Sequence, residues 1–175
     1  MSERTYQYRE GRNYIGEIRL DGEVDITDPC YEKGIWCRMT EKCEPGIYTG
    51  YADIVDEGEW GMRVARIEIL KDDIHCEEEY YDPIGSIGVD AGLAGFFRDK
   101  PDYPNDEWID FLVESGVFKT RDEHDYSKAY YAIDYGLFSE SGYGDGGYTV
   151  YANEERTAFM IEFIGEEDED EDEDY

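Results

Sequence analysis

The sequence predicts a mostly β protein (class α+β): an antiparallel β-sandwich or open barrel with one packed helix and a disordered acidic C-terminal tail. Short runs of alternating apolar residues recur along the chain, turn-forming pairs such as Asp21-Gly22 and Pro45-Gly46 separate them, and one stretch has helical spacing. Aromatic residues make up 15% of the 175 residues, enough to form the core of one domain. We therefore expect a single β-rich domain over residues 1–165 and an acidic tail over 166–175.

The first half of the body contains five expected strands. Asp21-Gly22 is a signal for a two-residue hairpin, which would pair a strand over 14–20 with one over 23–27. Further strands are expected over 35–39, 47–55 and 61–70. The last of these carries apolar residues on both faces, which indicates a strand that is covered on both sides or contains a β-bulge.

One helix is expected after two short strands over 84–89 and 94–97. Pro104-Asn105 provides a cap, and the acidic residues that follow complement the dipole of the first turn. An apolar stripe at helical spacing predicts packing against the core and ends at Gly116; it consists of Trp108, Ile109, Leu112 and Val113.

Strands over 129–138, 148–152 and 157–164 are expected to complete the body. The last two are joined by Asn153-Glu154-Glu155-Arg156, a hairpin loop. From Gly165 onward, a run of acidic residues should repel itself and remain in solvent.

The charge of the chain excludes several functions. It has 46 acidic and 16 basic residues, a net charge of −30, and without the nine acids of 166–174 the body keeps 37 acids against 16 bases, a net of −21. Direct binding to nucleic acid needs a basic face, and adsorption to an anionic membrane is disfavoured for the same reason.

No apolar run could span a bilayer, and no hydrophobic signal-peptide core is present, so a cytoplasmic location is expected. A halophilic surface is an alternative origin of the charge, but Ile is more frequent than Ala, against the usual halophile composition.

No catalytic residue, metal site or cofactor can be assigned from motifs. The four cysteines form no C-x-x-C pair, and two histidines are too few for a His₃ metal site. Gly142-Tyr143-Gly144-Asp145-Gly146-Gly147 fits the letters of a dinucleotide fingerprint, but a strand follows it and Asp145 would repel phosphate, so a glycine-rich turn is expected. The sequence leaves enzymatic activity undecided and favours a non-enzymatic protein.

Five short motifs occur in a recognisable order. They are Asp28-Pro29-Cys30, Pro45-Gly46-Ile47-Tyr48, Arg63-Val64-Ala65, Gly88-Val89-Asp90-Ala91-Gly92 with Asp99 after it, and Gly144-Asp145-Gly146-Gly147-Tyr148. In this order and spacing, over about residues 24–164, the chain resembles the DUF4241 family of uncharacterised bacterial and phage proteins. The resemblance supports the domain boundaries and implies no known activity. Leu93 follows the Asp-Ala-Gly where the family pattern usually has a threonine, which argues against a phosphate- or hydroxyl-dependent role for this turn.

Three hypotheses for the function follow. In the first, the chain is a non-enzymatic acidic domain that binds a basic protein, as an inhibitor or as a nucleic-acid mimic of the anti-defence type that occupies a basic groove. Its body charge of −21 is comparable to the roughly 23 phosphate charges on duplex DNA as long as the domain's diameter of about 40 Å. Tyr80, Tyr81 and Tyr143 have acidic neighbours in the sequence and would supply contact area.

In the second hypothesis, the turns form a small-molecule or metal-binding site, which could be enzymatic. Asp28, Arg63, Asp90 and Asp145 would converge there, and Arg63 would bind an anionic group; a structural ion pair explains the arginine equally well. The Asp90 turn also has a purely structural interpretation, as a tight turn whose aspartate bonds its own backbone. In the third hypothesis, the chain is a soluble domain whose charge serves solubility alone.

Overall fold

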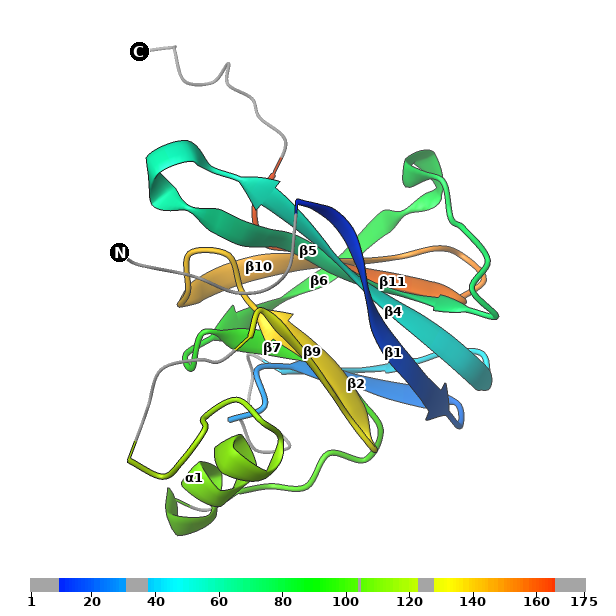
Figure 1. Cartoon of the computed structure of the whole chain (residues 1–175). Helices are drawn as coiled ribbons and strands as arrows, with labels where there is room; N and C mark the ends of the chain where they lie inside the picture. Colours follow the sequence, from blue (N-terminus) through cyan, green and yellow to red (C-terminus); the bar gives the residue numbers. More distant parts are fainter. Residues whose placement is uncertain (1–9, 31–37, 104, 123–127, 166–175) are drawn as a thin grey trace.

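Alternation of apolar and polar residues along the strands gives two antiparallel sheets that face each other across a core (Figure 1). The structure, a computed structural model, describes residues 10–30, 38–103, 105–122 and 128–165. The mostly β class with one helix is as predicted. The acidic tail, 166–175, lies outside the described residues.

The larger sheet has six strands, in the order β1-β4-β5-β11-β10-β6. Their bounds are β1 Gly11–Leu20, β4 Gly46–Asp56, β5 Met62–Lys71, β11 Ala158–Glu162, β10 Gly146–Ala152 and β6 Asp82–Val89. The smaller sheet has five strands, in the order β3-β2-β7-β9-β8. Their bounds are β3 Met39–Lys42, β2 Glu23–Thr27, β7 Leu93–Phe97, β9 Gly136–Glu140 and β8 Tyr130–Ile133. Two short 3₁₀ turns, η1 (Gly58–Trp60) and η2 (Glu78–Tyr80), lie in the connections.

The two faces of the smaller sheet are both covered. Phe96 on β7 belongs to the core between the sheets, together with Ile67 and Phe159 of the larger sheet. Phe97, the next residue, belongs to a second apolar cluster with Phe111 of helix α1 (Asn105–Glu114). The helix therefore packs on the outer face of the smaller sheet, and the predicted apolar stripe faces this second core.

The expected hairpin at Asp21-Gly22 was wrong. β1 pairs with β4, whereas β2 pairs with β3 and β7, so the two-residue turn carries the chain from one sheet into the other. Gly22 adopts φ 123°, and the residues on each side of the turn, Leu20 and Val24, are both 0% exposed in the core. A turn between sheets and a hairpin turn thus require the same local residues.

Two other expected strands differ from the structure. The segment over 129–138 is a hairpin, β8–β9, because the chain turns at Asp134-Tyr135. At Gly136, just after this turn, a Cβ atom would lie 2.2 Å from the ring of Phe97, so a side chain would collide with the next strand. Of the strand expected over 35–39, residues 35–37 lie outside the described residues, and Met39 begins β3.

For the segment over 61–70, the sequence left open a strand covered on both sides or a β-bulge, and a β-bulge is present. Asp53 lies opposite Arg66 and Ile54 opposite Val64, which leaves Ala65 as the extra residue of β5. The bulge places Val64 in the same core as Ile67. The hairpin loop over 153–156 is also present, joining β10 and β11. In the part of the chain that the structure describes, no helix is long and apolar enough to cross a membrane.

Candidate binding sites at the two ends of the larger sheet

Three connections meet at one end of the larger sheet because its strands are antiparallel. Gly146 at the start of β10 lies opposite Val89 at the end of β6, which brings the 141–145 loop beside the 90–92 turn. The backbone N–H of Phe163 donates to the carbonyl of Ala65 at 2.7 Å, which holds the start of β5 at the same end. Side chains from distant parts of the sequence therefore converge here.

A hollow of about 190 Å³ opens between these connections. It is lined by Arg63, Asp90, Ala91, Gly92, Glu140, Ser141, Gly142, Tyr143, Gly144 and Asp145. Asp90 and Asp145 are exposed at its rim, and Glu140 is 4% exposed. The volume is below the roughly 300–1,000 Å³ of sites for drug-sized ligands, so the hollow has room only for a small polar molecule or a single side chain.

Arg63 joins the turn before β5 to the 141–145 loop, which borders the hollow. Its Nε donates to the carbonyl of Trp60 at 3.0 Å, and its Nη1 donates to the carbonyl of Gly142 at 3.3 Å. Its Cζ lies 4.7 Å from the centre of the Tyr143 ring, a cation–π contact. The hydroxyl of Tyr143 in turn donates to Glu57 at 2.6 Å, and burial together with this acceptor raises the pKa of Tyr143 to about 12. These contacts of Arg63 are to backbone carbonyls and a ring, not to the carboxylate of the expected ion pair.

Asp28 lies beneath the hollow and does not line it. The side chain of this fully buried residue accepts three backbone hydrogen bonds: Oδ1 from Cys30 at 2.9 Å, and Oδ2 from Asp90 at 2.7 Å and Ala91 at 2.6 Å. Burial raises the pKa of Asp28, and the bonds to the backbone oppose that shift. Asp28, which directly follows β2, thus holds the 90–91 turn from below by binding the backbone N–H groups of that turn.

A second buried polar cluster lies on the outer face of the smaller sheet, and sequence reasoning missed it. Asp25, Arg38 and Lys100 are all buried, and the most exposed of them, Arg38, is 8% exposed. Arg38 pairs with Asp25 at 3.0 Å, and Asp25 also accepts hydrogen bonds from Thr40 at 2.8 Å and from the backbone of Lys100 at 3.2 Å. Burial, followed by the nearby Arg38, lowers the pKa of Lys100 to about 8. Nothing in the pattern of β2 distinguishes Asp25 from an ordinary outward-facing aspartate.

Tyr80 and Tyr81 lie at the opposite end of the larger sheet, away from the hollow, in the connection from β5 to β6. Tyr80 is 61% exposed. The hydroxyl of Tyr81 donates to the buried Glu68. The seven predicted site residues are therefore divided: Arg63, Asp90, Tyr143 and Asp145 surround the hollow, Asp28 lies below it, and these two tyrosines belong elsewhere.

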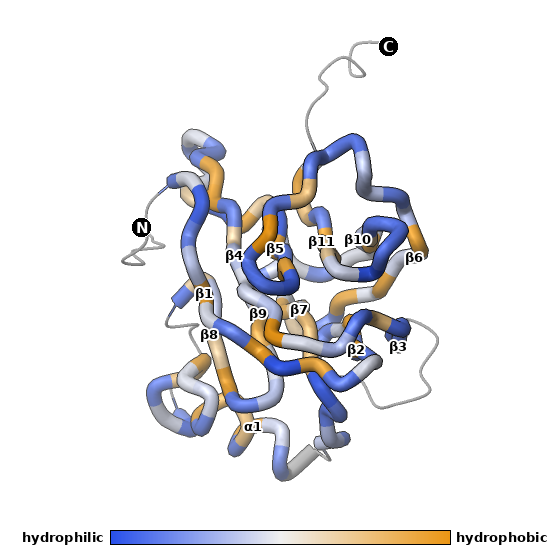
Figure 2. Tube along the Cα trace, turned by 90° about the vertical axis from the view of Figure 1, so that its right-hand side faces the viewer, coloured by the Kyte–Doolittle hydropathy of each residue, from blue (hydrophilic) through white to orange (hydrophobic). Residues whose placement is uncertain are grey.

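This opposite end carries a concentration of acidic side chains, which we call the acidic end: Glu41, Glu44, Asp72, Asp73, Glu77, Glu78, Glu79, Asp82, Glu154 and Glu155. Its loops touch: the N–H of Glu44 donates to the carbonyl of Arg156 at 3.0 Å, and that of Asp72 donates to Ile47 at 2.9 Å. Figure 2 shows hydrophilic residues along the connections near β5, β6, β10 and β11. Two large apolar side chains stand out among these acids, Ile74 at 67% and Tyr80 at 61% exposure.

Two basic side chains at the acidic end are themselves paired with acids of this end. Arg156 contacts Glu41 at 2.9 Å, and Lys71 contacts Asp72 at 3.1 Å. Most of the acidic side chains there therefore keep their charge available to a partner. Among the described residues, no group of three or more His, Cys, Asp or Glu side chains could hold a metal ion.

Comparison of the chain with family models, curated proteins and solved structures gave no match. The resemblance to the DUF4241 family therefore stays a prediction.

Proposed function

We propose that the protein is a non-enzymatic acidic domain that binds a basic protein partner through the acidic end. The observation that carries the proposal is the exposure of Ile74 and Tyr80 within a field of carboxylates. Large exposed apolar side chains surrounded by polar ones are typical of protein interfaces, and tyrosine gives rigid contact area at low entropy cost. Carboxylates on the rim select a basic partner and accelerate its association.

A more specific form of the proposal is nucleic-acid mimicry. The body charge of −21 is large enough to compete with a DNA segment of similar length for a basic groove. In this form the partner is a nucleic-acid-binding protein that the chain inhibits. Duplex DNA should then displace the partner from the domain, and a partner that binds both at once would contradict mimicry while leaving protein binding intact.

The test is capture from host lysate at about 50 mM and about 500 mM salt, followed by affinity measurements with the captured protein. We compare Glu77→Gln/Glu78→Gln/Glu79→Gln with the charge-matched control Glu59→Gln/Glu114→Gln/Asp122→Asn, whose residues are exposed and lie away from the acidic end. Because an exposed ion pair contributes about 0.2–1 kcal/mol, the first variant should bind about tenfold more weakly and the control nearly as well as the wild type. Equal loss in both variants, or binding insensitive to salt, would contradict the proposal.

A second candidate function is a small-molecule site in the hollow. The observation in its favour is that Arg63, Asp90 and Asp145, far apart in sequence, line the same hollow. A small zwitterion, with a cationic and an anionic group, would match a lining that mixes a guanidinium with carboxylates. Asp90→Asn/Asp145→Asn should abolish the thermal stabilisation produced by such a ligand in a screen of amino acids and other small zwitterions, with folding intact. Unfolding of this variant would support a purely structural role for the turns.

A further inference from the structure

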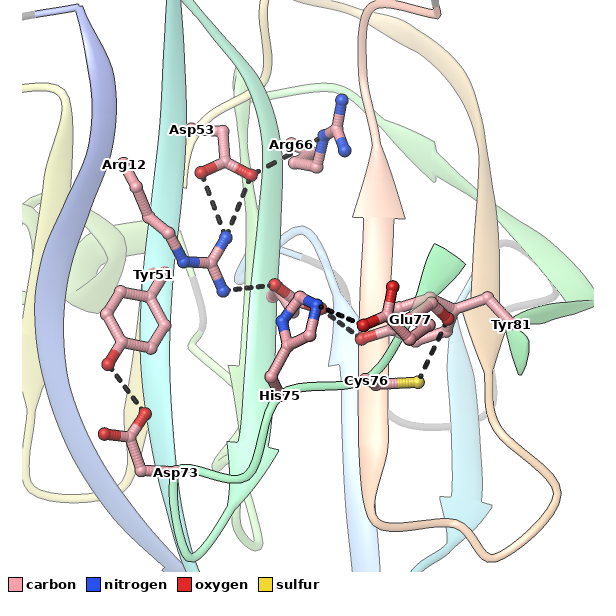
Figure 3. A network of polar contacts seen from close by, with 10 residues as sticks. Arg12, Tyr51, Asp53, Arg66, Asp73, His75, Cys76, Glu77 and Tyr81 are labelled. Carbon is pink, nitrogen blue, oxygen red and sulfur yellow. Dashed lines mark hydrogen bonds and ion pairs between the residues drawn. The ribbon is translucent and has the colours of Figure 1, made fainter. Parts of the chain in front are cut away.

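The connection from β5 to β6, residues 72–81, carries the exposed Ile74 and Tyr80 and is fastened to the outer face of the larger sheet at two points (Figure 3). Near its start, Asp73 accepts a hydrogen bond from the hydroxyl of Tyr51 at 2.6 Å. At its end, the hydroxyl of Tyr81 donates to Oε2 of Glu68. Both anchors are side chains of the sheet, so the conformation of this loop depends on the order of that face.

Glu68 is the buried half of the second anchor. It lies in the middle of β5, between Tyr51 of β4 and Met160 of β11, and it is 5% exposed. A buried carboxylate is costly unless its oxygens are paired. Arg12 contacts Oε1 at 2.5 Å, and Tyr81 contacts Oε2. Loss of either partner would leave part of the carboxylate buried without compensation.

Arg12 on β1 connects the two anchors. Its Cζ lies 4.2 Å from the centre of the Tyr51 ring, and its Nη2 reaches Glu68. Its Nη1 also donates to both carboxylate oxygens of Asp53, at 3.1 and 3.2 Å. Figure 3 shows Arg12 between Asp53 and the ring of Tyr51, which points toward Asp73. One guanidinium therefore contacts the side chains that hold both ends of the loop.

We propose that Arg12 and Glu68 are positioning residues for partner binding: they hold residues 72–81 in the conformation that presents Ile74 and Tyr80 to the partner. This inference rests on the proposed function. It makes a prediction that charge alone does not. Replacement of Arg12 by a neutral residue makes the protein more acidic, so simple attraction predicts tighter binding to a basic partner, whereas loss of positioning predicts weaker binding.

The first measurement needs no partner. In the free protein, the N–H groups of Tyr80 and Tyr81 donate to the carbonyls of Glu77 and Glu78 at 3.0 and 3.2 Å, so their hydrogen exchange reports on the order of the loop. In Arg12→Gln and Tyr81→Phe, exchange of these two amides should accelerate about tenfold, because a hydrogen bond to a charged group is lost. Amides in β10 should not change. Tyr81→Phe removes a single hydroxyl and keeps the test valid if Arg12→Gln does not fold.

The second measurement is affinity for a labelled peptide of alternating arginine and leucine. Arg12→Gln should bind it roughly threefold to tenfold more weakly than the wild type does. The matched control is Arg19→Gln, which makes the same charge change at an exposed position of the same strand. It should bind as tightly as the wild type or more tightly.

Unchanged exchange in both Arg12→Gln and Tyr81→Phe would overturn the positioning role, whatever the protein binds. The positioning role would also be overturned if Arg12→Gln bound the peptide more tightly than the wild type, by the same factor as Arg19→Gln. Failure of the wild-type domain to bind any basic partner would refute the proposed function instead, and accelerated exchange in the variants would still establish the contribution of Arg12 to the loop.

Discussion

Asp28 connects the end of β2 to the turn that borders the hollow, so its replacement is expected to destabilise the whole domain. Asp28→Ala leaves the partly buried N–H groups of Cys30, Asp90 and Ala91 without their carboxylate acceptor. A hydrogen bond to a charged group contributes about 1.5–3 kcal/mol to stability. Two of the three donors share one oxygen, and removal of the carboxylate also removes the cost of burying it, so the three contributions do not add in full.

We therefore expect Asp28→Ala to lower the free energy of unfolding by about 3 kcal/mol, and Tm by roughly 6–12 °C for a domain of this size. Asp28→Asn keeps one acceptor oxygen and should lose about half as much. The assay is urea unfolding followed by tryptophan fluorescence, with Trp60 and Trp108 in different parts of the fold. The control is Asp145→Asn, exposed at the rim, for which a change within about 0.5 kcal/mol is expected.

A loss below about 0.5 kcal/mol in Asp28→Ala would refute this reasoning, because it would mean that solvent or other groups satisfy the three N–H groups. A large loss in Asp145→Asn as well would show that the rim carboxylates are structural, which would also weaken the case for a ligand in the hollow.

Three further predictions concern packing and charge. Gly95→Ala places a Cβ atom 2.1 Å from the carbonyl oxygen of Leu137, a backbone atom that cannot move aside, so the free energy of unfolding should fall by more than about 3 kcal/mol. In the control Gly147→Ala, the nearest neighbour of the new Cβ atom is 3.9 Å away, so soluble expression and the urea midpoint should be retained. The pKa of Lys100 is lowered from 10.5 to about 8, so between pH 8 and 10.5 the unfolded chain binds more protons than the native protein. The stability of the wild type relative to Lys100→Met should therefore rise as the pH increases from 8 to 10.5. A difference in urea midpoints that does not change with pH would contradict this prediction. Added NaCl should raise the thermal midpoint of the free domain, because salt screens the self-repulsion of a body with a net charge of −21. A thermal midpoint that falls with added NaCl would argue against net repulsion in the native state.

Local patterns were sufficient to predict most elements of this fold. Apolar runs bounded by turn residues located β4 and β5, period-two alternation located β10, and the capped apolar stripe located α1, because these signals lie within a few residues. The pairing of strands was not predictable in the same way. Asp21-Gly22 satisfies the backbone demands of a hairpin and of a turn between sheets equally well, and the partners that decide between them, β4 for β1 and β7 for β2, are distant in the chain.

The candidate sites, too, were only partly predictable from the sequence. The residue types at Arg63, Asp90 and Asp145 drew attention in the sequence because turn residues and charges coincide there, and strand register then placed them around one hollow. Composition determined that the protein is strongly acidic, and local apolar patterns with turn signals determined that it is β-rich. Only the tertiary structure decided that Asp28 supports a turn 62 positions away and that Arg12 reaches Glu68 across β4, because both contacts depend on sheet register, a property of chain segments that meet only after folding.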